Sequence, residues 1–93
     1  MKTPLFSIIT ITFNAESTLE PTLCSVAAQQ ENDYEYLIVE GASKDGTVAL
    51  ARQYDCVTRI ISEPDRGLYD AMNKGIKAAT GEYLVFLNAG DSL

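Results

Sequence analysis

The sequence lacks histidine and tryptophan and contains only two cysteines, Cys24 and Cys56. Without histidine and without a Cys-x-x-Cys pair, a zinc site is not expected. The same absence excludes a Ser-His-Asp triad, and no Gly-x-Ser-x-Gly elbow occurs. Neither a dinucleotide-binding Gly-x-Gly-x-x-Gly motif nor a P-loop is present. Because both cysteines fall within apolar patterns, we expect reduced thiols in the core.

Positive charge and long apolar runs are also scarce. The 7 Lys and Arg residues are outnumbered by 13 Asp and Glu, which gives a formal net charge of −6. A phosphate backbone would repel this chain, so we expect no nucleic-acid partner. No apolar run approaches the roughly 20 residues that span a bilayer, and the first residues do not form a secretory signal. We therefore expect a cytoplasmic protein, at most peripheral to the inner face of the membrane.

The residues that are present indicate a small α/β domain. The 93 residues are 46% hydrophobic, which suffices for one domain with a core and no more. Apolar β-branched runs alternate with segments of helical period, a pattern typical of a mainly parallel sheet. The predicted order is βαβαβαβ in three layers. Strands are expected over 6–12, 34–39, 58–62 and 83–87. Helices are expected from the loop at 13–16 to about 30, from an opening at 44–47 through 54, and over 67–79.

Finer predictions concern the helices. Ser17 and Glu20 have the spacing of a capping box, whereas Pro21 favours a helix start one turn later. Asp45 is the predicted N-cap of the short second helix. Tyr69 is expected to pack beside the apolar stripe of the last helix. That stripe consists of Leu68, Met72, Ile76 and Ala79.

Every predicted strand ends in polar or acidic residues. In an open α/β sheet the carboxyl ends of the strands share one rim, and ligands bind there where the strand order reverses. Carboxylates, an arginine and an aromatic ring at such a rim suit a nucleoside whose phosphates are bridged by a divalent cation. Strand-end loops are polar in most proteins, so an ordinary surface stays open as well. The segments are Thr12-Phe13-Asn14, Glu40, Glu63-Pro64-Asp65-Arg66 and Asn88-Ala89-Gly90-Asp91.

Four segments in order resemble the family 2 glycosyltransferases, in particular the branch that acts on cell-surface polysaccharides. The segment Ser7–Glu16 is similar to the family's opening strand followed by Thr-Tyr-Asn and an acidic residue. The segment Glu40–Thr47 resembles the family's Asp-Asp/Gly-Gly-Ser-Thr-Asp-Gly-Thr motif. Glu63–Gly75 and Ala79–Tyr83 complete a likeness that covers nearly the whole chain.

The resemblance implies the nucleotide-binding half of a GT-A fold, with residues 1–93 as a single partial domain that lacks the acceptor half. It implies an inverting transfer of sugar from a nucleotide-diphosphate donor to a saccharide or lipid-linked acceptor, in polysaccharide or lipopolysaccharide assembly. The implied cofactor is Mg²⁺ or Mn²⁺, bound by Asp91. The implied donor site comprises Thr12, Phe13, Asn14, Glu16, Glu40, Arg66, Gly67, Asp70, Asn73, Lys74 and Asn88.

Within that site, Thr12, Phe13 and Glu16 would border the nucleobase, and Glu40 would face the nucleoside. The family's usual Asp-Ala-Asp-Asp is Asn88-Ala89-Gly90-Asp91 here, which leaves Asp91 as the one local anionic ligand. Whether the protein requires a metal ion is therefore left open by the sequence. The family's catalytic base belongs to the acceptor half beyond residue 93, so none is assigned in this chain.

Other interpretations stay open on the sequence alone. A sugar-nucleotide pyrophosphorylase shares the architecture but needs a Gly-rich basic loop after the first strand, and a non-catalytic nucleotide-binding or interaction module fits the altered metal motif. Asp70 and Lys74 have the i, i+4 spacing of a surface ion pair as well as a pocket position, and Phe13 could pack in the core. Because the chain ends just past its fourth strand, we expect an exposed edge and hence self-association or marginal stability.

Overall fold

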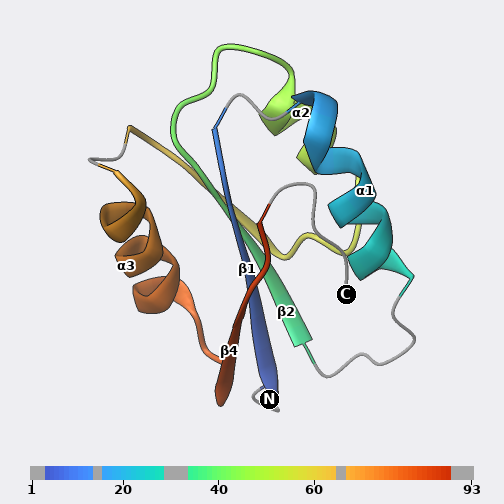
Figure 1. The fold of residues 1–93 in the computed structure, drawn as a ribbon. Helices are drawn as coiled ribbons and strands as arrows, with labels where there is room; N and C mark the ends of the chain where they lie inside the picture. The colour runs from blue at the N-terminus through green and yellow to red at the C-terminus, as the bar shows by residue number, and fades with distance from the viewer. Residues whose placement is uncertain (1–3, 14–15, 29–33, 65–66, 89–93) are drawn as a thin grey trace.

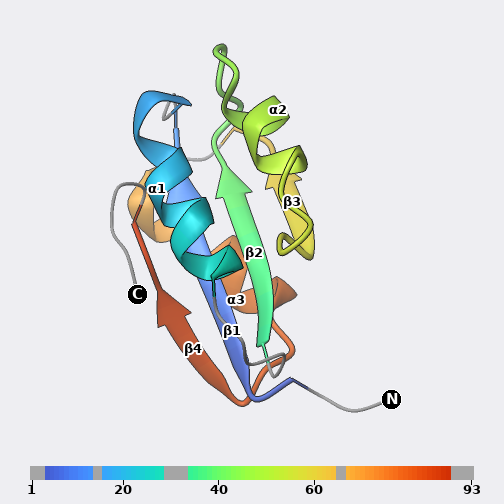
Figure 2. The ribbon, with the colours of Figure 1, turned by 90° about the vertical axis from the view of Figure 1, so that its right-hand side faces the viewer.

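The computed structural model describes residues 4–13, 16–28, 34–64 and 67–88. It contains β1 (Phe6–Thr12), α1 (Glu16–Ala27), β2 (Tyr34–Glu40), α2 (Thr47–Arg52), β3 (Arg59–Ser62), α3 (Leu68–Ala78) and β4 (Tyr83–Phe86). The strands are parallel and lie in the order β3-β2-β1-β4. Helices α1 and α2 cover one face of the sheet and α3 covers the other (Figures 1 and 2). The predicted α/β class, element order and parallel sheet are confirmed.

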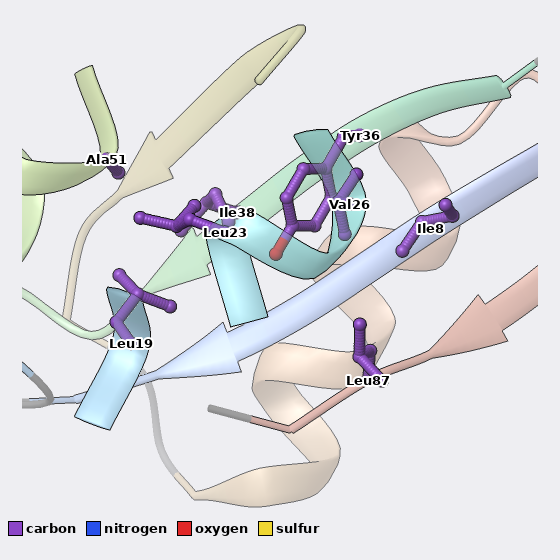
Figure 3. Close-up of a cluster of buried hydrophobic side chains, with 8 residues drawn as sticks. All are labelled: Ile8, Leu19, Leu23, Val26, Tyr36, Ile38, Ala51 and Leu87. Atoms are coloured by element: carbon purple, nitrogen blue, oxygen red, sulfur yellow. The ribbon is translucent and has the colours of Figure 1, made fainter. Parts of the chain in front are cut away.

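The core is divided by the sheet into two clusters. Alternate residues of a strand point to opposite faces, so Ile8 and Ile38 pack under α1 while Ile9 and Leu37 pack under α3. Both central strands are therefore apolar on both faces, as a covered parallel sheet requires. The larger cluster (Figure 3) contains Ile8, Leu19, Leu23, Val26, Tyr36, Ile38, Ala51 and Leu87.

Helix α1 begins at Glu16, so neither the capping box nor the later start predicted from Pro21 is correct. Pro21 lies inside the helix, where it removes the backbone hydrogen bond that residue 21 would otherwise donate to Ser17. Leu19 and Leu23 flank the proline and are fully buried against the sheet. Burial of such side chains stabilises by about 1.5–3 kcal/mol each, which offsets one lost hydrogen bond.

Helix α3 packs against the sheet mainly through small residues, and Ala79 of the predicted stripe packs against the smaller cluster. Ala71 and Gly75 face the sheet, whereas Ile76 is 44% exposed. A Cβ atom at Gly75 would lie 2.8 Å from Cγ2 of Ile9, which shows how closely the helix approaches β1. Tyr69 is 82% exposed, so the prediction that it packs was wrong. Tyr69 and Ile76 are thus exposed on this helix, while Ala71 and Gly75 approach the sheet.

Both cysteines are free thiols. Cys56 is half-buried and packs against the larger cluster, whereas Cys24 is exposed on α1, so the prediction of a core residue was wrong for Cys24. The hydroxyl of Tyr54 lies 3.3 Å from Sγ of Cys24 and donates to Oε2 of Glu20 at 3.1 Å. This contact helps to join α1 to the segment after α2. Among the described residues, no helix is long and apolar enough to cross a membrane.

The amino end of the sheet is held by Glu35 of β2. Its Oε2 atom accepts hydrogen bonds from Ser7 Oγ at 2.5 Å, Thr80 N at 2.5 Å and Thr80 Oγ1 at 3.1 Å. Ser7 Oγ in turn accepts from the backbone N–H of Gly81 at 2.8 Å. One carboxylate thus connects β1, β2 and the turn between α3 and β4.

Candidate functional site

The carboxyl ends of the strands lie at the same end of the molecule as the starts of the helices (upper end in Figure 1). The chain passes from β1 to β2 and β3 in one direction and then returns to place β4 on the other side of β1. The strand order therefore reverses between β1 and β4, and the crevice of such a fold lies beyond the ends of these two strands. Thr12 and Phe13 stand at the end of β1, and Asn88 follows β4.

Thr12 places a hydroxyl at this point. The residue is 4% exposed, its backbone carbonyl accepts from Gly41 N at 3.1 Å, and its buried Oγ1 has no hydrogen-bond partner among the described residues. A buried polar atom without a partner costs about 1–3 kcal/mol. Such a cost is removed when a ligand or water supplies the missing bond.

Phe13 is 61% exposed, so the alternative that it packs in the core was wrong. An exposed aromatic ring at the end of β1 can stack on a planar ring such as a nucleobase. The two residues together provide one polar and one apolar contact at the end of β1.

Glu40 is buried at the end of β2, with 1% of its surface exposed. Its Oε1 accepts from Ser43 N at 2.5 Å and its Oε2 accepts from Ser62 Oγ at 2.7 Å. These bonds tie the loop after β2 to β3, and Ala42 in that loop adopts a left-handed φ of 62°. Each carboxylate oxygen keeps acceptor capacity for a further donor, so Glu40 is fixed in place without being saturated.

Lys74 connects the start of α3 to the preceding loop. Its Nζ donates to the carbonyl of Pro64 at 2.7 Å and lies 3.3 Å from the carboxylates of Glu63 and Asp70. Partial burial disfavours the charged amine, but the hydrogen bonds to both carboxylates outweigh it and raise the pKa of Lys74 above its ordinary value. The predicted alternative of an Asp70–Lys74 ion pair is therefore realised.

The remaining predicted residues are placed as follows. Gly67 is the N-cap of α3 with a φ of 114°, a conformation that glycine adopts without strain. Asn73 and Asn88 are exposed, and the carbonyl of Asn88 accepts from Thr22 Oγ1 at 3.3 Å. Asn14, Arg66 and Asp91 lie outside the described residues. Within the described part of the chain, no three His, Cys, Asp or Glu residues are grouped to hold a metal ion, so Asp91 stays a prediction.

A hollow of about 540 Å³ lies between α1 and α2. It holds two carboxylates and no basic side chain, which opposes the binding of a polyanion such as a diphosphate. It lies in the helical layer rather than beyond the ends of β1 and β4. The lining residues are Glu16, Ser17, Glu20, Pro21, Gly46, Ala49, Leu50 and Gln53.

The sequence pattern did not reveal that the side chain of Asp45 accepts a hydrogen bond from the backbone N–H of Glu16 at the start of α1. The N-cap of α2 is Gly46 and not Asp45 as predicted, although Asp45 Oδ1 still accepts from Thr47 N at 3.0 Å and from Thr47 Oγ1. The hydrogen bond from the Thr47 side chain is the main cause that holds the pKa of Asp45 below its ordinary value. The spacing of Asp45 and Thr47 signalled a helix start, but nothing in it signalled a bond to α1.

The sequence matches the description of glycosyl transferase family 2 over residues 7–92, and the chain belongs to this family. It is 42% identical over 97 residues to a PGL/p-HBAD biosynthesis glycosyltransferase of Mycobacterium bovis (strain BCG / Pasteur 1173P2), covering 100% of this chain and 38% of the relative. It is 36% identical over 92 residues to TuaG of Bacillus subtilis (strain 168), to which a glycosyltransferase role in teichuronic acid biosynthesis has been attributed; the match covers 95% of this chain and 36% of TuaG.

The fold is that of the GT-A glycosyltransferases. The structure superimposes with a TM-score of 0.84 on the mannosyltransferase PcManGT from Pyrobaculum calidifontis, solved in complex with GDP-Man and Mn²⁺. The two sequences are 27% identical, and the match covers 96% of this chain and 28% of that protein. The chain thus spans between about a quarter and two fifths of the proteins it matches.

Proposed function

We propose that this chain forms the donor-binding part of an inverting glycosyltransferase. The protein would bind a nucleotide-diphosphate sugar and transfer the sugar to a hydroxyl group of a saccharide or lipid-linked acceptor, in polysaccharide or lipopolysaccharide assembly. The observation that carries the proposal is the pair of residues at the strand switch point. There the buried Thr12 hydroxyl has no partner among the described residues, and Phe13 beside it is exposed.

The two residues divide the recognition of the nucleoside. Phe13 stacks on the base, and the Thr12 hydroxyl supplies a directional hydrogen bond to the base or ribose. Glu40, which its two serine partners hold in place, accepts a hydrogen bond from the nucleoside. Asn14, Gly67, Asp70, Asn73 and Asn88 border the same pocket.

The diphosphate is bound by positive charge. Lys74 is already neutralised by Glu63 and Asp70, so Arg66 is the proposed partner of the phosphates and Lys74 positions the loop that carries it. A divalent cation, Mg²⁺ or Mn²⁺, would have Asp91 as a ligand and would supply further neutralisation of the leaving diphosphate. The Mn²⁺ in the PcManGT complex supports this cofactor.

The cytoplasmic location stays a prediction.

The proposal is tested by calorimetric titration of the chain with UDP and with GDP, each with and without Mn²⁺. We expect metal-dependent binding of one nucleotide, lost in Asp91→Ala and weakened roughly fivefold to a hundredfold in Phe13→Ala, because stacking on a base contributes about 1–3 kcal/mol. The matched control is Tyr83→Ala, since Tyr83 is similarly exposed (59%) but lies at the other end of the sheet.

Unchanged affinity of Phe13→Ala would remove the proposed base site, and the absence of binding by either nucleotide would contradict the proposal for this chain. Nucleotide binding without any sugar transfer by the complete protein would favour the non-catalytic module instead.

A further inference from the structure

The start of α1 and the loop after β2 are joined by a reciprocal pair of hydrogen bonds. The backbone N–H of Glu16 donates to Oδ2 of Asp45 at 3.3 Å, and the backbone N–H of Gly46 donates to Oε1 of Glu16 at 3.0 Å. The partners are 29 and 30 residues apart in the sequence. Each segment therefore supplies one carboxylate acceptor and one backbone donor to the other.

Both ends of this pair are anchored in rigid elements. Asp45 also accepts from the backbone and side chain of Thr47, which is fully buried in the first turn of α2. Glu16 is the first residue of α1, whose Leu19 is fully buried against the sheet. Helix N-termini attract carboxylates, so the starts of α1 and α2 favour both acidic side chains in their observed places.

The absence of a side chain at Gly46 makes room for the contact. A Cβ atom at this position would lie 2.4 Å from Oε2 and 2.8 Å from Cδ of Glu16. The backbone of Gly46, with φ −80° and ψ 15°, is open to any residue. An alanine at position 46 would therefore displace the Glu16 carboxylate without straining the backbone of its own loop.

We propose that Glu16 is a positioning residue, which with Asp45 and Gly46 fixes the start of α1 against the loop after β2 and so sets the width of the nucleoside pocket. The proposal rests on the proposed function, in which the nucleoside lies between Phe13 on one loop and Glu40 at the base of the other. It assigns the Glu16 carboxylate to the protein rather than to the nucleobase. The ligand it serves is a nucleoside diphosphate held by an aromatic face on one loop and an acceptor on the other.

The pair of hydrogen bonds that joins Glu16 to Asp45 and Gly46 is tested by NMR amide exchange. The exchange is measured in the chain and in four variants: Glu16→Ala, Gly46→Ala, the double variant, and Glu16→Gln. Loss of one hydrogen bond accelerates local exchange about fivefold. We expect that acceleration at the amides of residues 44–47 in both single variants and no further increase in the double variant, because both changes break the same contact. Glu16→Gln should exchange like the wild type, since its amide oxygen still accepts from Gly46. Glu82→Gln, an exposed carboxylate near the amino end of the sheet, is the control.

The same proteins are titrated with UDP and GDP in the presence of Mn²⁺. We expect both single variants and the double variant to lose affinity equally, about fivefold, with rescue in Glu16→Gln. A loss in Glu16→Gln as large as in Glu16→Ala would show that the charge contacts the ligand and would overturn the positioning role. Wild-type exchange rates in both single variants would show that this pair of hydrogen bonds does not hold the two segments together. A wild-type chain that exchanges as expected but binds neither nucleotide would contradict the proposed function, and the positioning role would fall with it.

Discussion

At the scale of single residues, polar groups that look available in the sequence are mostly engaged with the protein itself. Glu16 contacts a backbone group of the loop before α2, Lys74 one of the loop before α3, and Glu40 one of the loop that follows it. Thr12 is the exception, because its buried hydroxyl has no partner among the described residues. A polar side chain that holds a loop in place and one that is available to a ligand look the same in a sequence. Only the hydrogen-bond partner seen in the structure distinguishes the two.

Glu35 gives the sharpest residue-scale prediction for stability. Partial burial acts to raise the pKa of Glu35, but the hydrogen bonds from Ser7, Thr80 and Gly81 outweigh it and lower the pKa below 4.5. A carboxylate whose pKa is lowered on folding stabilises the protein above its unfolded pKa, and that contribution is lost as the pH falls through the folded pKa.

We therefore expect Glu35→Gln to reduce the free energy of unfolding by about 1 kcal/mol at neutral pH, the lower end of the range because the group is partly exposed. Urea unfolding at neutral pH and at a pH below the folded pKa measures the difference, which should shrink in acid. Glu82→Gln serves as the control. A difference that does not depend on pH would show that the ionised carboxylate is not the source of the stability.

At the scale of elements, the contact of α3 with the sheet depends on small side chains. Ala71 is 1% exposed, and Gly75 faces Ile9 and Val39 at distances that exclude a methyl group. Glycine at position 75 has a lower helix propensity than alanine would have, but it allows α3 to approach β1 and β2 closely. That approach carries the start of α3 to the same rim as the ends of the strands.

Gly75→Ala should consequently destabilise the protein. Overpacking costs about 1–3 kcal/mol, and the better helix propensity of alanine returns up to about 1 kcal/mol. We expect a net loss of about 1 kcal/mol in the free energy of unfolding, measured by urea denaturation. Lys77→Ala on the exposed side of α3 should instead be neutral or slightly stabilising. A gain in stability in Gly75→Ala would mean that the sheet yields to the added methyl group at no cost.

At the scale of the whole molecule, β4 forms one edge of the described sheet. Tyr83, Leu84 and Phe86 of this strand are 59%, 42% and 39% exposed. An edge strand with free backbone groups and apolar side chains pairs readily with another chain. The described residues thus present an apolar edge on the β4 side of the sheet.

We predict that the isolated chain self-associates through β4. Sedimentation velocity over a range of concentrations should show dimers or larger species, and Leu84→Lys should shift the distribution to monomers. Ile76→Lys is the matched control, because Ile76 is similarly exposed (44%) but lies on α3. A monomer with a cooperative and high melting transition at every concentration would contradict the prediction.

The sequence alone determined the element order and the bounds of β1, because β-branched apolar runs favour strands and a helical period records which face of a helix a side chain occupies. It also placed Thr12, Phe13, Glu40 and Asn88 at strand ends, and their motifs indicated the family. Their roles in binding stay predictions.

The tertiary structure alone decided the strand order β3-β2-β1-β4, the exposure of Tyr69 and Ile76, and the bonds between Glu16 and the start of α2. Each of these depends on which distant segment approaches an element and how closely. The approach is set by packing between residues far apart in the chain, such as Gly75 against Ile9. A local period carries no information about such partners, so the sequence predicted the parts and the packing determined how they meet.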